Sequence, residues 1–426
     1  MAEKKKEKMV RLRGYDELDG MYVPESMIPK YENLGNGCYG KGTEVCDYKS
    51  KKLDVVIPEG VTMIAENAFS GKNIKSITIP TTLTVINTSS FSFCRYLEEI
   101  KVADGHPTYH VEGNCLIDTK TKTLVMGLNK SVIPANDSVT KIASYAFRAN
   151  GSGNCVIPAN IVELCDSSFC GCGMYNLTIP ASIKKIGKRA FASCHCLQNL
   201  VIEEGVTELS EEMFSNCEFL KNVKLPESLR VIGKQAFYSC ERLENINIPA
   251  NLERVERTAF CWSNNWCNGL NGHLVIPKNL KIGYASFPCA SIESISVEEG
   301  NPYYYCENNC LIETATKTLV LGCKNSTIPN DIKKIGDGAF YFALGLKKVV
   351  IPESVEEIGE IAFRFCKDLE EVEIPNSVME IGEATFNCVQ EFYEVLKLKK
   401  VKIPKRFEHR MDIFDEPNNI NFEFTE

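Results

Sequence analysis

The sequence lacks several features that would place it in a common functional class. It has no run of 18 or more consecutive apolar residues, which argues against insertion into a membrane as a helix. Its five histidines stand in unrelated contexts, and it has no glycine-rich phosphate loop, so spacing predicts neither a catalytic triad nor a nucleotide site. A basic surplus is also missing, because the formal net charge is -8. We therefore expect no nucleic acid as a partner.

The N-terminal segment lacks an export signal. It reads MAEKKKEKMVRLRGYDELDG, which is basic at first but has no apolar stretch behind it. This predicts a cytoplasmic protein, or a cell-surface or secreted one if an export segment is missing from this chain. The 20 cysteines would indicate a disulfide framework in a small secreted protein. Without export we expect reduced thiols, most of them buried like small apolar residues.

A short motif recurs along most of the chain. Its Ile-Pro anchor or a degenerate copy passes from Ile157 through Ile179, Ile202 and Leu225 to Ile248, at steps of 22, 23, 23 and 23 residues. The full unit, Leu-x-x-Val-x-Ile-Pro-x-x-Val-x-x-Ile-Gly-x-x-Ala-Phe-x-x-Cys, is complete at residues 346–366. Such a period predicts a repeat solenoid, mostly β and coil, in which each coil buries its apolar face against its neighbours.

Each part of the unit predicts a part of the coil. Val-x-Ile alternates with polar residues and is β-branched, which indicates a half-buried strand. The proline after it cannot donate to a sheet ladder and ends the strand. Val-x-x-Ile predicts a second short extended stretch. The glycine that follows is expected to form a corner through a positive φ. These glycines are Gly187, Gly233, Gly336, Gly359 and Gly382.

Phenylalanine and cysteine recur at fixed places after the glycine. One ring per coil predicts a stacked column that forms the spine of the core. A cysteine three residues later predicts a small buried side chain that is also a weak hydrogen-bond donor at a tight corner. The clearest copies are Phe147, Phe169, Phe191, Phe214, Phe237, Phe260, Phe340 and Phe363, with Cys94, Cys172, Cys194, Cys217, Cys240 and Cys366.

Two coils are interrupted in the same way. Residues 104–134 and 299–329 run in step at a constant offset of 195 residues. We expect each to contain an inserted β-hairpin that projects from one side of the stack. The solenoid would span residues 53–404, with residues 1–52 as the N-terminal cap and 405–426 as the C-terminal cap, because repeat stacks need polar ends.

The repeat unit resembles the BspA-like, or Treponema-type, class of leucine-rich repeats. The resemblance covers roughly residues 53–404, and it extends to Asn301-Pro302-Tyr303 at the entry to the second insertion. It implies a right-handed leucine-rich-repeat superhelix with a parallel β-sheet face. It also implies adhesion or protein binding, often on the surface of mucosal microbes.

Positions 3 and 5 of Leu-x-x-Val-x-Ile are predicted to point away from the core, because side chains alternate along a strand. Position 3 is asparagine in four successive coils. Stacked amides can hydrogen-bond along such a sheet, so the row is either a ladder that satisfies itself or a polar platform for a partner's backbone or glycan. The candidate binding residues are Asn176, Thr178, Asn199, Val201, Asn222, Lys224, Asn245 and Asn247.

The same face becomes charged towards the C-terminus. Opposite charges on adjacent strands predict cross-strand pairs. The last lysine row is also expected to discourage edge-to-edge pairing of the sheet. The rows are Lys347, Lys348 and Val350, then Glu370, Glu371 and Glu373, then Lys399, Lys400 and Lys402.

A metal site is not predicted. Cysteines at 165, 170, 172, 194 and 196 fall on neighbouring coils, but their Cys-x-Cys spacing differs from that of zinc knuckles. No catalytic residue and no cofactor is predicted either.

Three functions remain open. The first is a non-enzymatic binding or adhesion module whose partner is another protein or a surface glycan. The second is an intracellular structural scaffold. The third is a carbohydrate-binding or carbohydrate-active protein, in which Tyr303, Tyr304 and Tyr305 would line a sugar subsite.

Overall fold

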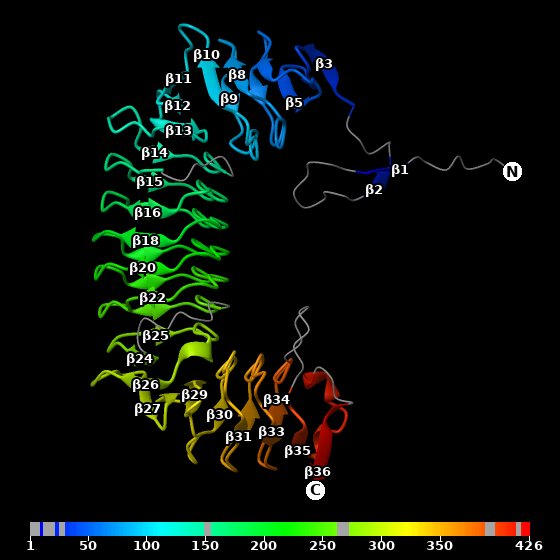
Figure 1. Cartoon of the computed structure of the whole chain (residues 1–426), viewed down its shortest axis with the longest axis vertical. Coiled ribbons are helices and arrows are strands. Elements are labelled where there is room, and N and C mark those ends of the chain that lie inside the picture. The colour runs from blue at the N-terminus through cyan, green and yellow to red at the C-terminus, as the bar shows by residue number, and fades with distance from the viewer. Residues whose placement is uncertain are drawn as a thin grey trace, which may run out of the picture. The chain divides into compact units, whose positions relative to one another are not determined.

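The computed structural model of the chain is a solenoid of short strands and turns (Figure 1). The predicted fold class, a repeat solenoid with parallel sheets and two inserted hairpins, is confirmed. The described part of the chain contains no helix with the length and apolarity needed to cross a membrane. The structure describes residues 9–11, 22–24, 30–148, 155–261, 272–387, 397–414 and 419–426. The chain forms two compact units, Met1–Tyr175 with Ser182–Cys194, and Asn176–Ala181 with His195–Glu426.

Each regular coil contributes one strand to each of two sides. The Leu-x-x-Val-x-Ile strand lies on the side that we call the open face, and it pairs in parallel with the same strand of the next coil. Leu177 and Leu200, for example, pair across β16 and β18 and are both buried. The shorter Val-x-x-Ile strand lies on what we call the second side.

The strands of the two sides have the following bounds. In the first unit the open face holds β6 (Asp54–Val56), β8 (Ser76–Ile79) and β10 (Glu99–Val102), and the second side holds β7 (Met63–Ile64), β9 (Val85–Ile86), β14 (Lys141–Ile142), β15 (Glu163–Leu164) and β17 (Lys185–Ile186). In the second unit the open face holds β16 (Asn176–Ile179), β18 (Asn199–Ile202), β20 (Asn222–Lys224) and β22 (Asn245–Ile246), then β24 (His273–Ile276) and β26 (Ser294–Val297), then β31 (Lys348–Val350), β33 (Glu371–Glu373), β35 (Lys400–Pro404) and β36 (Asn421–Thr425). The second side of this unit holds β19 (Glu208–Leu209), β21 (Val231–Ile232), β23 (Arg254–Val255) and β25 (Lys281–Ile282), then β30 (Lys334–Ile335), β32 (Glu357–Ile358) and β34 (Glu380–Ile381). Outside these sheets, the described residues form the antiparallel pair β1 (Met9–Arg11) and β2 (Tyr22–Pro24) and the short 3-10 turns η3 (Cys289–Ser291), η4 (Lys405–Phe407) and η5 (Met411–Ile413).

The phenylalanine rings stack from coil to coil, as the sequence predicts. In the first unit Phe169 lies between Phe147 and Phe191, with ring centroids 4.8 and 5.2 Å apart. In the second unit Phe237 lies between Phe214 and Phe260, at 5.5 and 5.2 Å. The rings are nearly parallel and fully buried. Contacts of this kind are attractive beyond the burial of their apolar area, so the column forms the spine of the core.

The cysteines that follow these rings bond to the backbone of the neighbouring coil. The Sγ atoms of Cys94 and Cys172 each lie 3.0 Å from the carbonyl oxygen of the phenylalanine 25 residues earlier. A small apolar side chain that also donates to a buried carbonyl suits this position. The same bond is made by Cys194, Cys240 and Cys366 to Phe169, Phe214 and Phe340.

The corner glycines are required for space, and the prediction that they have a positive φ is wrong. A Cβ atom on Gly233 would lie 2.6 Å from the carbonyl oxygen of Leu209 in the neighbouring coil. On Gly382 it would lie 2.3 Å from the backbone nitrogen of Glu360. The positive φ occurs two residues later, on side-chain-bearing residues such as Gln235, at 56°. Close approach of the coils therefore explains the glycine.

Each insertion forms a hairpin that is built into the second side. Strands β11 (Tyr109–Glu112), β12 (Cys115–Asp118) and β13 (Thr123–Met126) form an antiparallel meander, and β13 then pairs in parallel with β14. Strands β27 (Tyr304–Glu307), β28 (Cys310–Glu313) and β29 (Thr318–Leu321) repeat this arrangement with β30. The hairpins are confirmed, but the expected projection from the stack is wrong, because Leu116 and Ile117 are buried.

A third meander lies at the N-terminal end of the first unit's second side. It consists of β3 (Glu32–Gly35), β4 (Cys38–Lys41) and β5 (Glu44–Tyr48), and β5 pairs in parallel with β7. Its residues Cys38, Val45 and Tyr48 are buried in the core. This copy is not apparent in the sequence, because the segment has no Cys-Leu-Ile motif.

Candidate functional site

The four asparagines of the central open face form a hydrogen-bonded row. Asn199 Nδ2 donates to Asn176 Oδ1 at 2.7 Å, and Asn222 Nδ2 donates to Asn199 Oδ1 at 2.7 Å. Asn245 Nδ2 donates to Asn222 Oδ1 at 2.6 Å. The parallel register places each asparagine directly opposite the next. The predicted ladder is therefore present, and we call these four residues the asparagine ladder.

The other predicted residues flank this ladder. Thr178, Val201 and Lys224 are exposed one position beyond the buried residue of each strand, and Val201 retains 38% of its surface. Asn247 bonds instead to the backbone, accepting from Leu225 N–H at 2.8 Å and donating to the Leu225 carbonyl at 2.9 Å. A shallow groove runs over this part of the sheet, lined by Asn199, Val201, Asn222, Lys224, Asn245 and Asn247.

An aromatic and cationic pair near the ladder was not predicted from the sequence. The Arg242 guanidinium lies 4.1 Å from the ring centroid of Phe219, and this ring retains 39% of its surface. Both residues immediately precede the leucine that leads into an open-face strand. The sequence contains a sign of this pair. Phe219 occupies the position before that leucine, where a later coil has the charged residue Asp368.

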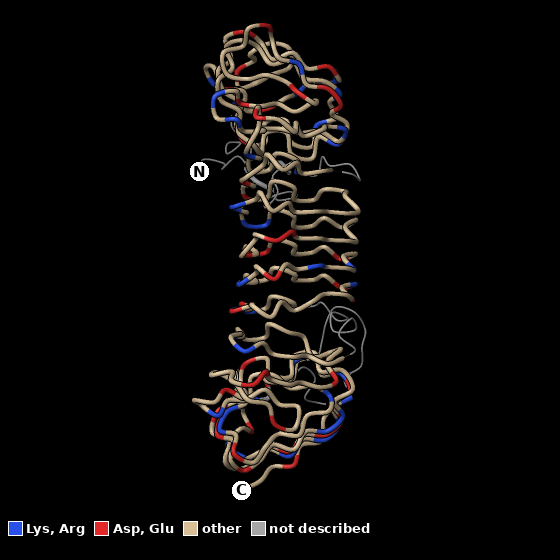
Figure 2. The backbone as a smooth tube through the Cα atoms, turned by 90° about the vertical axis from the view of Figure 1, so that its left-hand side faces the viewer, with Lys and Arg blue, Asp and Glu red and all other residues tan. Residues whose placement is uncertain are grey.

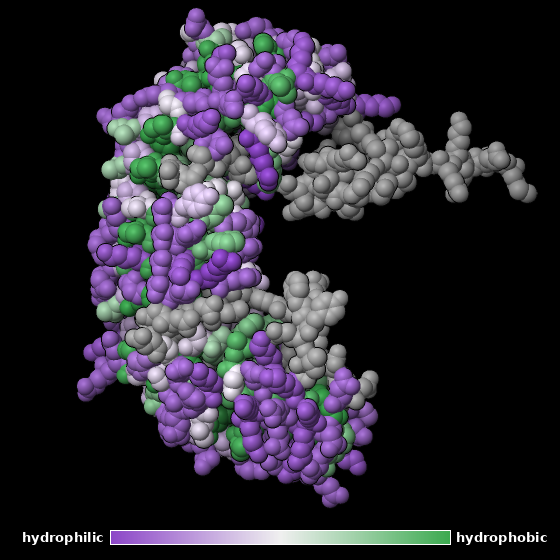
Figure 3. Space-filling model, viewed as in Figure 1, coloured by the Kyte–Doolittle hydropathy of each residue, from purple (hydrophilic) through white to green (hydrophobic). Residues whose placement is uncertain are grey.

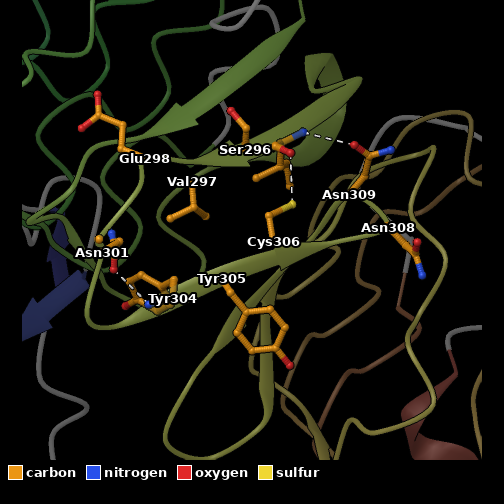
Figure 4. Close-up of a pocket in the computed structure, with 11 residues that line it drawn as sticks. Ser296, Val297, Glu298, Asn301, Tyr304, Tyr305, Cys306, Asn308 and Asn309 are labelled. Carbon is orange, nitrogen blue, oxygen red and sulfur yellow. Dashed lines mark hydrogen bonds between the residues drawn. The ribbon is translucent and has the colours of Figure 1, made fainter.

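The open face is interrupted at each insertion, and polar side chains cover the strand edge there. Ile295 N–H of β26 points to Asn309 Oδ1 at 3.4 Å, and the Cys306 thiol donates to the Ile295 carbonyl at 3.0 Å (Figure 4). In the first insertion Asn114 Oδ1 lies 3.3 Å from Ile100 N. These side chains partly replace the next strand of the sheet.

The tyrosines of the second insertion mainly pack the structure. Tyr304 is buried, and its hydroxyl accepts from Ile282 N–H at 3.1 Å. Tyr305 is half-buried beside the cleft between β26 and β27 (Figure 4). Its hydroxyl accepts a hydrogen bond from Lys317 Nζ at 2.9 Å. The Lys281 ammonium lies 4.5 Å from the Tyr303 ring centroid. These contacts leave no continuous aromatic shelf of the kind a sugar ring would use.

The C-terminal part of the open face carries the predicted ion pairs. Glu371 lies between Lys348 and Lys400, at N–O distances of 3.2 and 3.4 Å. Lys402 pairs with Glu373 in the same sheet. Positive and negative positions lie side by side among these coils (Figure 2). Hydrogen bonds from Lys348 and Lys400 hold the pKa of the Glu371 carboxyl below its ordinary value.

The ion pairs of Glu371 predict a pH dependence of stability. Because the pKa of Glu371 is lowered in the folded state, its stabilisation is present above the ordinary carboxyl pKa and is lost as pH falls through the lowered value. The urea midpoint should therefore fall more between pH 7 and pH 3 for the wild type than for Glu371→Gln. Glu408→Gln removes an exposed carboxylate outside these ion pairs, so the urea midpoint of this variant should fall as much as that of the wild type. Equal falls for all three would contradict this assignment.

The last lysine row does not form the edge of the sheet, so the role predicted for it is wrong. β36 pairs in parallel with β35, and Glu423 lies opposite Lys402. The edge strand contains Phe422 and Phe424 instead of lysine. β36 was not predicted, because its sequence has no Ile-Pro anchor.

Many carboxylates of the coils bind backbone groups. Glu204 accepts the N–H groups of Glu227 at 2.9 Å and Ser228 at 3.0 Å in the next coil. These backbone hydrogen bonds, Glu227 first, lower the pKa of the Glu204 carboxyl. Asp166 and Asp337 accept in the same way from Lys188 and Glu360. These carboxylates therefore link the backbones of neighbouring coils.

The cysteines of the described residues are thiols, and those residues contain no cluster of three or more His, Cys, Asp or Glu suited to a metal ion. Burial is the main influence on their chemistry. It raises the pKa of Cys94, Cys115 and Cys310 to about 12 each.

These raised values predict resistance to alkylation. At pH 8 only about one molecule in ten thousand would carry the reactive thiolate at a group with pKa near 12. Cys94, Cys115 and Cys310 should therefore remain unmodified when the native protein is treated with iodoacetamide and analysed by mass spectrometry. In urea all three should react rapidly. Rapid native labelling of Cys94 would show that the column is open to solvent.

The repeat geometry agrees with a known sequence family. The pattern described as the BspA type leucine rich repeat region matches in six copies, over residues 46–137, 140–267 and 319–409. The chain belongs to the BspA-type leucine-rich repeat family. The solenoid, its parallel open face and its buried phenylalanine column are the form that the BspA-type repeat takes in this chain.

Solved structures of bacterial repeat proteins resemble this BspA-type chain. A leucine-rich repeat protein from Eubacterium ventriosum is 21% identical, with a TM-score of 0.51 over 58% of this chain and 68% of that one, which shows a shared fold. One from Bacteroides ovatus is 25% identical over 93% and 98% of the two chains, with a TM-score of 0.47. A leucine rich cell surface protein from Faecalibacterium prausnitzii is 18% identical over 94% and 96%, with a TM-score of 0.43. Comparison with curated proteins gives no match.

Proposed function

We propose that this BspA-type repeat protein is a non-enzymatic binding module, and that another protein docks on the open face of β16, β18, β20 and β22. The asparagine ladder is the observation that carries the proposal. Because its amides hold one another in place, a partner does not have to order them, which reduces the entropic cost of binding. Each inner amide uses one N–H and one lone pair in the ladder, so a second N–H and a second lone pair remain for a partner.

The surroundings of the ladder favour a protein over a glycan. Val201 adds exposed apolar surface and Lys224 adds a positive charge within the same groove. Phe219 and Arg242 add an aromatic ring and a guanidinium, the residue types that are enriched in protein interfaces. The space-filling view shows a mostly hydrophilic surface with smaller apolar patches on the visible side of the chain (Figure 3).

Site-specific photo-crosslinking tests the proposal. A photoreactive amino acid at position 201 should capture a protein that excess unmodified chain displaces. The matched control is position 162, where Val162 is 42% exposed beside β15 on the second side. Adding Lys224→Glu to the position-201 probe should strongly reduce capture. Equal capture from positions 201 and 162, or capture that Lys224→Glu leaves unchanged, would argue against docking on this face.

The location of the protein is a separate proposal. We propose a cytoplasmic location, where the chain would act as a scaffold with reduced thiols. Cell fractionation combined with thiol counting tests this, since an exported form is expected to contain oxidised cysteines.

A further inference from the structure

We propose that β36 binds an extended peptide strand whose residues read apolar, basic, apolar. β36 is the last strand of the sheet β31, β33, β35 and β36, and no described strand pairs with its outer edge. This surface lies at the end of the charged part of the open face. It is distinct from the asparagine ladder, and the inference does not depend on the function proposed for that ladder.

The backbone of β36 presents hydrogen-bonding groups at this edge. Asn421 N–H donates to the Lys399 carbonyl at 2.8 Å, and the register continues through Glu423 opposite Lys402. In a parallel pair, alternate residues direct both their N–H and C=O groups to the same neighbour. Asn421, Glu423 and Thr425 therefore bond towards β35, and the N–H and C=O groups of Phe422 and Phe424 point to the open edge. A new parallel strand would find two donors and two acceptors there.

The side chains of the sheet define the apolar requirement. Phe422 lies opposite Val401, and Phe424 lies opposite Ile403. Val401 and Ile403 are fully buried, and Val401 has a strand partner on each side, Val372 and Phe422, whereas Phe424 retains 40% of its surface. Phe422 also contacts the buried Phe414, with centroids 5.2 Å apart. Two apolar residues of an added strand would extend these core rows and cover the exposed rings.

The outward-facing row defines the basic residue. Glu373, Lys402 and Glu423 lie opposite one another on three successive strands, so the charge alternates along the row. Lys402 is bonded to Glu373 on its other side. A lysine or arginine opposite Glu423 would continue the alternation, and directly opposed unlike charges stabilise a sheet.

The same row disfavours a second copy of the chain as the occupant. A two-fold related pair of β36 strands would be antiparallel, and alignment of the phenylalanines would place Glu423 opposite its own copy. Like charges directly opposite each other destabilise a sheet. Binding of an added strand to an exposed sheet edge is a general mode of peptide recognition, in which backbone bonds supply affinity and alternate side chains supply specificity.

A peptide of the sequence KKVKIP provides the probe. It reproduces residues 399–404, the strand that already lies against β36 on the inner side. Fluorescence anisotropy with the full chain should show saturable binding, and a scrambled peptide, VIKKKP, should bind much more weakly. Hydrogen exchange of the protein, analysed by mass spectrometry, should show new protection in the proteolytic fragment that contains Phe422 and Phe424 when KKVKIP is bound.

A charge exchange supplies the decisive comparison. Glu423→Lys should weaken binding of KKVKIP by about five- to tenfold, and the peptide KKVEIP should recover that loss on the variant. Glu408→Lys, the matched control, should leave binding of KKVKIP unchanged. The proposal is overturned by equal affinity for the scrambled peptide, by protection at another strand, by failure of the exchange, or by a dimer that excludes the peptide.

Discussion

Replacement of Phe237 by alanine is expected to lower the free energy of unfolding of its part of the stack by about 3–5 kcal/mol. The ring is fully buried, and its centroid lies 5.5 Å from that of Phe214 and 5.2 Å from that of Phe260. The variant loses the burial of one ring and both stacking contacts, and it leaves a cavity in the spine of the core. Urea denaturation followed by far-UV circular dichroism should show an earlier and broader transition.

The position of the damage is as informative as its size. In a repeat stack each coil contacts only its neighbours, so hydrogen exchange should increase in the coils that contain Phe214 and Phe260 and much less in distant coils. Phe219→Ala is the matched control, because that ring is 39% exposed and should contribute far less. A uniform loss of protection across the chain, or equal effects of the two substitutions, would contradict a column that acts locally.

The repeating parts of the fold were predictable because the same residue type recurs at the same place in many copies of the repeat unit. The phenylalanine column, the thiols behind it and the asparagine ladder all occur where the 23-residue period places them. A residue type that returns at one place in many coils must satisfy the same contact each time. The period therefore shows which side chains meet, even without knowledge of the coil's shape.

The unpredicted parts occur once, or depend on the backbone. The meander of residues 32–48 shares its strand pairing with the two insertions but too little of their sequence to be aligned with them. β36 adds to the sheet without the motif that marks the other open-face strands. The insertions were expected to project from the stack. The sequence indicates a hairpin in each, but it does not show that the last strand, β13 or β29, pairs with the next strand of the second side.

The candidate site was predictable to a similar extent. Alternation along the strand correctly placed Asn199 and Asn222 on the outside, and the period placed them opposite each other. It did not reveal that Asn247 would turn to the Leu225 backbone, because β22 ends at Ile246 and leaves that backbone without a strand partner. Whether a partner uses the face remains a prediction.

The second large effect is expected at the corner glycines. Gly233→Ala should destabilise the protein by about 1–3 kcal/mol, because its Cβ would lie 2.6 Å from the Leu209 carbonyl oxygen and 3.1 Å from the Glu211 nitrogen. These are backbone atoms of the adjacent coil, which cannot move aside as a flexible side chain can. The two coils would have to separate, and the loss should appear as a lower urea midpoint.

Gln235→Gly is the matched substitution that distinguishes space from backbone freedom. Gln235 has a φ of 56°, a conformation that disfavours a residue with a Cβ, so glycine relieves strain in the folded state. Glycine also increases the entropy of the unfolded chain, so the net effect should lie between no change and a stabilisation of about 1 kcal/mol. If the corner instead depended on backbone freedom at Gly233 alone, Gln235→Gly would relieve no strain and would destabilise the protein, as Gly233→Ala does, because glycine increases the entropy of the unfolded chain. Both variants should be measured in the same urea titration. A lower free energy of unfolding for Gly233→Ala and an equal or higher one for Gln235→Gly would establish two separate effects. The neighbouring coil excludes a side chain at position 233, and the backbone is strained at position 235.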